Sequence, residues 1–443
     1  MKRIKNLPES SFLKLFFAFV SLCLLVGAVC MPDRAGMVAG LWEIIKSPCR
    51  TATNCFSIGG YSGTFLNMGL VAAVCALLFW ITGASANSVS TLAVLLTTGF
   101  GAWGLHVVNM LPPILGAGVF ALLKKQKLAD AVHAMLFSTG VTPLVSDMLV
   151  RYPHAEVVGF HISGVLLGLF VGLVTGLITF AGLSHSPNVH KGMNLYSAAL
   201  PVGIAAFFLN GLLYKAMGVP LPETPGDPAV ASGAVFNGFC LPLFGLCIVL
   251  ALLLGCTPRD YWRFLRNPDR VTDVAASYGN AVFFMNAGVY GLCIVAYYNI
   301  IGATLNGVIL GMVFCTVCCC NSGSRPSNFW PIIAGYVAAS FLGKWVSGIF
   351  GGDFSLVIYA PAIAIGLGFA NGLTPICDQY GWQYGVLAAG IHYCLVTIVP
   401  NLHGSFCLYN GGFTAIFVCI LLVPVLEKFC KTKEQRRLLK TAG

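Results

Sequence analysis

Residues 60–69 read GYSGTFLNMG, and residues 279–288, lying 219 positions further along the chain, read GNAVFFMNAG. The match continues without a gap over residues 60–116 and 279–335, where 16 of 57 aligned positions are identical. More than half of these identities are Asn, Gly or Pro, which shared apolar composition does not explain. The chain is therefore predicted to contain an internal repeat, a feature of many membrane transporters.

The composition is that of a membrane protein. Of the 443 residues, 57% are hydrophobic and only 9% are charged, and the mean hydropathy is +0.84. So few charges do not cover the surface of a soluble protein of this length. The net charge of +10 resides between apolar segments and at the two chain ends. This distribution fits the positive-inside rule and excludes a nucleic-acid footprint.

Apolar segments of the length needed to cross a bilayer, roughly 20 residues, follow one another along the whole chain. The sequence predicts fourteen, seven in each half, at about 11–30, 62–82, 87–104, 106–123, 130–148, 156–183, 195–216, 233–256, 280–299, 304–320, 328–346, 354–372, 382–400 and 408–427. Residues 11–30 are too long an apolar run for a cleaved signal peptide. The segments at 87–104 and 304–320 are short, so we expect them to be broken or re-entrant.

The expected fold class is an all-α polytopic membrane protein made of two inverted repeats, because an odd number of spans per repeat reverses the second half. Residues 1–218 form the first repeat, 219–232 a Pro-rich linker, 233–430 the second repeat and 431–443 a basic tail. The densest basic stretches, 2–5, 124–127, 259–270 and 428–440, fall on one side. This side is predicted to be cytoplasmic and to hold both termini, in the cytoplasmic membrane of a bacterium.

Two further motifs recur in the halves. One is Gly104-x-His106-x-x-Asn-x-x-Pro, which returns with Arg325 in place of His; the other is His-x-x-x-x-Leu-Tyr, beginning at His190 and His403. In these motifs the chain resembles a bacterial membrane family known as domain of unknown function fifteen seventy-six. The resemblance covers nearly the whole chain and implies no activity. The duplicated, inverted halves are also similar to urea transporters at the level of the fold, although the paired Asn-Asn-Pro signature is absent.

Repeated asparagines are the first candidates for a solute site. Asn67 and Asn286 head apolar spans, each followed two residues later by glycine, Gly69 and Gly288. They are predicted either to line a pathway or to hydrogen-bond between helices.

The asparagines that begin the two short segments are the next candidates. Asn87 and Asn306 are predicted to cap these helices, and a capped half-helix also points its positive end at a solute. These two interpretations are compatible with each other.

Histidine and tyrosine recur at the entry to the last span of each half. His190 and Tyr196 match His403 and Tyr409. Inverted halves would place them at the two mouths of one pathway, whereas the alternative is an interfacial anchoring role. His106 and Arg325, which match across the repeat, are expected at the same interfacial level.

Carboxylates are scarce near the centres of the spans. Asp147 and Asp378 follow Thr-Pro pairs near segment ends and are the candidates for ion coupling, the alternative being acids at helix ends. Because proton-driven and sodium-driven machines usually keep buried carboxylates, the sequence favours transport that needs no ion gradient.

The cysteines do not indicate a cofactor. Most of the eighteen lie in apolar segments and form no disulfide pattern. The cluster Cys315–Cys320 has no neighbouring His, Asp or Glu, so we expect small core residues rather than metal ligands. No metal, cofactor or catalytic residue is predicted.

The sequence thus favours a membrane transporter or channel for a small, mostly uncharged polar solute. Its expected partners are the lipid bilayer, the solute and possible further copies of the chain, with no nucleic acid. One alternative is an ion-coupled transporter that uses Asp147 or Asp378. Others are an enzyme acting on a lipid-linked substrate, with His190 and His403 as acid and base, and a structural membrane partner. Duplication favours transport, since an active site needs one copy of its residues.

Overall fold

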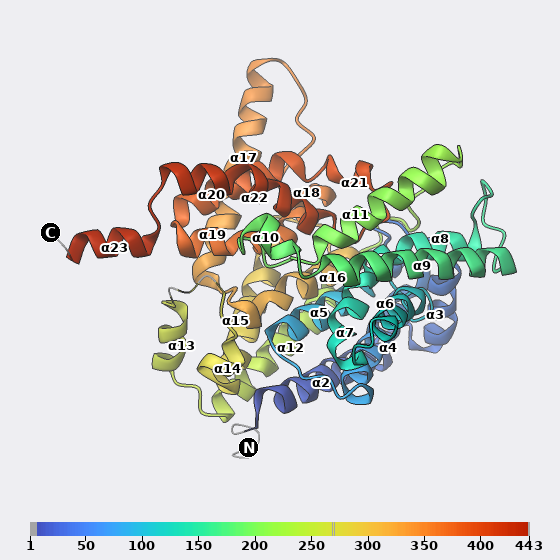
Figure 1. Cartoon of the computed structure of the whole chain (residues 1–443), viewed down its shortest axis with the longest axis horizontal. Coiled ribbons are helices and arrows are strands. Elements are labelled where there is room, and N and C mark those ends of the chain that lie inside the picture. Colours follow the sequence, from blue (N-terminus) through green and yellow to red (C-terminus); the bar gives the residue numbers. More distant parts are fainter. Residues whose placement is uncertain (1–6, 268, 270, 442–443) are drawn as a thin grey trace.

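The computed structural model describes residues 7–267, 269 and 271–441, and all of its regular secondary structure is helical (Figure 1). The basic residues Lys2, Arg3, Lys5 and Arg270, used above to orient the chain, lie outside the described residues.

The first half comprises helices of very different length. They are α2 (Glu9–Cys30), η1 (Arg34–Gly36), α3 (Met37–Lys46), α4 (Cys55–Ile81), α5 (Ser88–Phe100), α6 (Leu111–Leu123), α7 (Leu128–Phe137), η2 (Ser138–Val141), α8 (Thr142–Val150), α9 (Ile162–Gly182), α10 (Ser186–His190), α11 (Ala199–Asn210) and the π-helical η3 (Gly211–Ala216).

The second half is also entirely helical in its regular structure. It contains α12 (Gly233–Leu253), α13 (Pro258–Leu265), α14 (Val274–Tyr278), α15 (Asn280–Ile300), α16 (Gly307–Val317), η4 (Cys318–Ser322), α17 (Pro326–Ile349), α18 (Pro361–Ala370), η5 (Asn371–Leu373), α19 (Thr374–Gln379), α20 (Trp382–Leu395), α21 (Val399–Leu402), α22 (Asn410–Phe429) and α23 (Lys433–Thr441).

The polytopic membrane class predicted from the sequence is confirmed. Within the part of the chain that the structure describes, nine helical stretches are long and apolar enough to cross a membrane. Five of the fourteen predicted segments are shorter than that, among them α5 and α16. The predicted segment at 354–372 is displaced, since the helical path runs through α18, η5 and α19 over residues 361–379. Hydropathy located the apolar residues but not the helix ends.

Glycines that match across the repeat share an unusual backbone conformation. Gly60 kinks α4 with φ of 68°, and Gly279 separates α14 from α15 with φ of 88°. Gly104 and Gly323, which follow the short helices, have φ of 138° and 102°. Residues with a side chain rarely adopt such angles, which accounts for glycine at both copies.

The short helices α5 and α16 lie together in the protein interior and run antiparallel. Every residue of α16 is buried, as is α5 from Ser90 onward. The end of α5 meets the start of α16 at Gly99 and Gly311, and Asn321 Nδ2, beyond α16, donates to Thr91 Oγ1 near the start of α5 at 3.2 Å. Both segments are short, as predicted, and α5 and α16 are each continuous; a re-entrant path stays a prediction.

Several connections between helices lie at two opposite ends of the molecule, whereas the α17–α18 connection lies at the top of the view in Figure 1. In Figure 1 the start of α2 lies toward the lower left and α13, α14 and α23 lie at the left, while α3, the α8–α9 connection and the end of α11 lie at the right. At the right-hand end Arg50 Nη1 donates to Pro222 O at 2.6 Å. At the left-hand end Asn280 Nδ2 donates to Leu7 O at 3.3 Å.

We predict that Gly99→Ala or Gly311→Ala lowers stability in detergent by about 1–3 kcal/mol, because an added Cβ has no room. At Gly99 it would lie 2.5 Å from the carbonyl oxygen of Gly311. The control is Gly238→Ala on the exposed face of α12, where a Cβ meets nothing within 4 Å. Thermal unfolding of all three variants measures the effect, and equal melting temperatures would contradict the tight crossing.

Candidate functional site

In each half, the connection before the last long helix packs against a short 3-10 segment of the other half. The α10–α11 connection meets η5, and the α21–α22 connection meets η2. The backbone N–H of Leu195 donates to Gly372 O in η5 at 3.0 Å, and that of Leu408 donates to Gly140 O in η2 at 2.8 Å. The following residues, Tyr196 and Tyr409, lie against the same two glycines. At Gly372 a Cβ would come within 2.6 Å of the Tyr196 ring, so glycine is required there.

The two tyrosines are deeply buried, so the predicted location at pathway mouths or an interfacial belt is wrong. Both are 0% exposed. Tyr196 donates to Cys315 O at 2.7 Å, whereas the hydroxyl of Tyr409 has no hydrogen-bond partner among the described residues. The tyrosine ring was expected at the surface because it follows a polar connection, but that connection folds inward.

The two histidines also lie inside the protein rather than at open mouths. His190 is 1% exposed and its Nε2 lies 2.7 Å from Ser197 Oγ, seven residues later. His403 is 0% exposed and its Nδ1 lies 2.5 Å from Asn410 Oδ1, again seven residues later. Both imidazoles hold the turn that positions the adjacent tyrosine.

Asn67 and Asn286 make the same pair of backbone contacts in their respective halves. Asn67 Nδ2 donates at 2.7 Å to Gly101 O and to Leu105 O, just beyond α5. Asn286 Nδ2 donates at 2.9 Å to Cys320 O and Ser324 O, just beyond α16. Their amide donors therefore hold the ends of the short helices and are not available to a solute.

The glycines next to these asparagines mediate helix packing. A Cβ at Gly69 would lie 2.7 Å from Leu25 on α2, and one at Gly288 would lie 2.7 Å from the carbonyl oxygen of Phe244 on α12. The close contact of α2 with α4 and of α12 with α15 thus depends on these positions.

Asn87 and Asn306 cap the short helices, as the first of the two interpretations predicted. Asn87 Oδ1 accepts from Ser90 N and Asn306 Oδ1 accepts from Ile309 N, both at 3.1 Å. Asn87 is exposed whereas Asn306 is 6% exposed.

A second pair of caps, which sequence reasoning missed, joins the two halves. Asn54 Oδ1 accepts from Phe56 N of its own helix and from Gly307 N of α16. Its equivalent 219 positions later, Asp273, accepts from Ala276 N and, at 2.8 Å, from Ser88 N of α5. Besides its own asparagine cap, each short helix therefore donates its first N–H to a side chain of the opposite half. Asn54 and Asp273 share the 219-residue offset of the aligned stretch, and this offset could have indicated the pair from the sequence.

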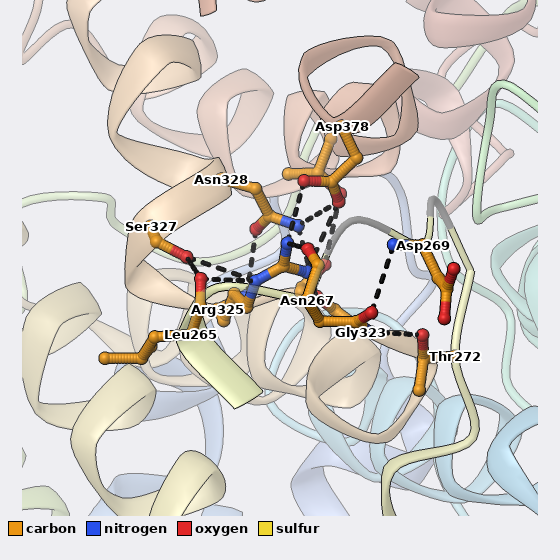
Figure 2. A network of polar contacts seen from close by, with 11 residues as sticks. Leu265, Asn267, Asp269, Thr272, Gly323, Arg325, Ser327, Asn328 and Asp378 are labelled. Carbon is orange, nitrogen blue, oxygen red and sulfur yellow. Dashed lines mark hydrogen bonds and ion pairs between the residues drawn. The ribbon is translucent and has the colours of Figure 1, made fainter. Parts of the chain in front are cut away.

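Asp378 is part of a buried ion pair at the left-hand end of the molecule, shown in Figure 2. Arg325 Nη2 donates to Asp378 Oδ1 at 2.8 Å, and Asn328 Nδ2 donates to Asp378 Oδ2 at 2.7 Å. The remaining guanidinium donors reach Leu265 O, Asn267 O and Gly323 O. One arginine thus joins α13, the end of η4, α17 and α19.

Asp147 forms a comparable pair at the opposite end. Arg151, four residues later, donates to both of its carboxylate oxygens, from Nε at 2.6 Å and from Nη2 at 2.7 Å. Tyr214 also donates to Asp147. Both aspartates are buried and paired with an arginine, and both lie near the ends of short helices, α8 and α19. The sequence spacing of Asp147 and Arg151 could have indicated this pair.

The position equivalent to the Arg325–Asp378 pair holds a neutral pair in the first half. His106 Nε2 lies 3.0 Å from Ser146 Oγ, and both residues are 0% exposed. The alignment of Thr142-Pro143 with Thr374-Pro375 places Ser146, not Asp147, opposite Asp378. His106 and Arg325 were expected at an interfacial level, but the structure buries both.

Three polar atoms around the last turn of α5 lack hydrogen-bond partners among the described residues, namely Asn67 Oδ1, Thr97 Oγ1 and the Tyr409 hydroxyl. Their equivalents are all bonded: Asn286 Oδ1 accepts from Tyr261, Thr316 Oγ1 donates to Met312 O, and Tyr196 donates to Cys315 O. The Tyr409 ring lies 5.1 Å from that of Phe100 in this turn. The unbonded members of these three pairs thus lie around α5, whereas the bonded members lie around α16.

The cysteine cluster is part of the core. Cys315 and Cys318–Cys320 are all 0% exposed, and Cys318 Sγ lies 2.9 Å from Cys315 O. Among the residues that the structure describes, no group of three His, Cys, Asp or Glu is arranged to hold a metal ion.

We predict that Arg325→Gln and Asp378→Asn each destabilise the protein by about 3–5 kcal/mol, because each leaves a buried partner without its counter-charge. The double variant Arg325→His/Asp378→Ser copies the neutral pair His106–Ser146 and should recover more than half of the loss.

Thermal unfolding in detergent measures these losses. The control is Lys46→Gln, which breaks the exposed Lys46–Glu43 pair and should cost less than about 1 kcal/mol. A double variant no more stable than either single one would argue against the equivalence of the two sites.

The comparisons with known proteins assign no activity to the chain. No curated protein and no solved structure matches the chain. A family model described as "Protein of unknown function (DUF1576)" matches residues 34–215 and 257–428, one region in each half and together most of the chain. The resemblance inferred from the sequence motifs is thereby confirmed: the chain belongs to the DUF1576 family of membrane proteins of unknown function.

Proposed function

We propose that this protein is a membrane transporter or channel, not an enzyme, for a small and mostly uncharged polar solute. The observation that carries the proposal is the reciprocal insertion of Leu195–Tyr196 and Leu408–Tyr409 into η5 and η2. Transporters built from two repeats bind their solute at the contact between the repeats, where helices are interrupted.

Inverted orientation of the two halves is part of the proposal. It is supported by the antiparallel packing of α5 and α16 and by equivalent hydrogen bonds, such as those of Asn67 and Asn286. The contacts between connections agree with the fourteen-crossing path, since Arg50 meets Pro222 at one end and Ser88 meets Asp273 at the other. The end that holds α13 and α23 is assigned to the cytoplasm because of its basic residues.

The chemistry of the solute follows from the unused polar atoms. Asn67 Oδ1 is an acceptor, while the hydroxyls of Thr97 and Tyr409 both donate and accept. A solute with uncharged donors and acceptors satisfies them without the cost of burying an ion. Asp147 and Asp378 are each matched by an arginine, which favours transport without ion coupling over the ion-coupled alternative.

Cysteine labelling tests the orientation. Lys125 is an exposed residue in the α6–α7 connection, and Asp353 is an exposed residue in the α17–α18 connection, which occupies the equivalent place in the second half. Single cysteines there, in a background without the exposed Cys30, Cys293 and Cys394, should react with an impermeant maleimide from opposite sides of the membrane. Labelling of both from one side would overturn the inversion.

Uptake into liposomes tests the function, with a screen across small neutral and ionic solutes. We expect uptake of a neutral polar solute that persists when an ionophore removes ion gradients. Tyr409→Phe should then lower flux by roughly tenfold, the equivalent of one lost hydrogen bond to the solute, without loss of thermal stability.

The matched control is Tyr196→Phe. It removes a hydroxyl that is already bonded to Cys315 O, so it should cost about 1 kcal/mol of stability and leave flux within about twofold. No uptake of any solute by the wild type would refute transport. Uptake that is insensitive to Tyr409→Phe would leave transport standing and exclude this location of the site.

A further inference from the structure

A cleft of about 480 Å³ opens at the left-hand end of the molecule, where α17, α19, α20 and α23 meet. Its lining combines an aromatic pair with cations of α23. The rings of Trp330 and Trp382 lie 5.7 Å apart, and Lys433 and Arg436 face the same space. Arg436 also donates to Tyr380 O, which attaches α23 to the body of the protein.

The electrostatics of this cleft favour an anion. It is bordered by the starts of α17, at Pro326, and of α20, at Trp382, where the helix dipoles place partial positive charge. The one carboxylate in the lining is Asp378, which is already paired with Arg325. Lys433 and Arg436 therefore add positive charge that the lining does not neutralise.

A second cationic cleft, of about 590 Å³, lies along α13 at the same end. It is lined by Arg259, Arg263 and Arg266 with Trp262, and the Arg266 guanidinium stands 4.6 Å from the Trp262 ring. A third cleft, of about 550 Å³, joins the two, because it shares Asp269 with one and Lys433 with the other. The joining cleft is mixed in charge, with Asp269, Asp378 and Glu434 beside Lys433 and Arg437, so the two cationic clefts remain distinct.

We propose that the cleft between Trp330, Trp382, Lys433 and Arg436 binds the phosphate of an anionic phospholipid headgroup. Trp262, Trp330 and Trp382 are 47–58% exposed, as is typical of tryptophans at the headgroup level of a bilayer. Helix α23 carries exposed Leu438 and Leu439 beside its basic residues, a composition that suits a helix lying in the interface. A soluble phosphate compound would need neither feature.

The second half alone provides this site. Helix α23 follows α22, whereas the equivalent helix α11 is followed by η3 and the linker 219–228, which contains Glu223 and Asp227 but no Lys or Arg. The basic cleft therefore faces one leaflet only. The assignment of that leaflet to the cytoplasm rests on the proposed orientation, but binding of the headgroup does not.

Native mass spectrometry of the full chain in detergent, titrated with phosphatidylglycerol or phosphatidylcholine, tests the proposal. The wild type should retain phosphatidylglycerol preferentially. Lys433→Gln/Arg436→Gln should weaken that retention about 30-fold, since each cation near an anionic lipid contributes about fivefold. Lys433→Gln alone keeps the Arg436 contact with Tyr380 O and should weaken it about fivefold.

The matched control is Lys124→Gln/Lys127→Gln, which removes two exposed cations from the α6–α7 connection and should leave retention unchanged. Equal retention of the two lipids by the wild type, or equal loss in the control and the cleft variant, would overturn the proposal. Displacement of phosphatidylglycerol by an equimolar amount of glycerol phosphate would assign the site to a soluble anion instead.

Discussion

Backbone carbonyls at the ends of helices must find donors when no water reaches them, and this requirement governs the centre of the protein. Helices α5 and α16 end inside the molecule, where Asn67 and Asn286 each supply one amide nitrogen to two carbonyls. The glycine turns at Gly104 and Gly323 follow directly. Without these contacts, a short helix ending in the protein interior would leave polar groups unsatisfied, at several kcal/mol for each group.

The backbone contacts around α5 and α16 are similar in the two halves, but the side chains there differ in charge and in hydrogen bonding. Where the first half uses the neutral His106–Ser146 pair, the second uses the Arg325–Asp378 ion pair. Where Tyr196 is bonded, Tyr409 is not. The same backbone framework therefore carries a charged, fully bonded side and a neutral side with free hydrogen-bonding capacity. A duplicated protein can keep its fold and still present two different environments to a bound molecule.

The membrane class could be predicted from the sequence because apolar segments recur along the chain, and the helix caps because Asn strongly prefers the start of a helix. Asn87 and Asn306 are examples. Burial of His190, His403 and the tyrosines could not be predicted, since it depends on a connection folding into a gap in the other half. The ion pair of Arg325 with Asp378 joins residues 53 positions apart, and no local pattern identifies it.

The shared caps have a consequence for the order in which the chain is made. Synthesis begins at the N-terminus, so α5 leaves the ribosome well before Asp273, whose side chain accepts from Ser88 N. Within its own half α5 has the Asn87 cap, but Ser88 N acquires the acceptor that it has in the structure only once Asp273 has been made. The start of α5 is therefore completed after the second half has begun to emerge. Asn54 and Asp273 thus link the two halves during folding as well as in the finished protein.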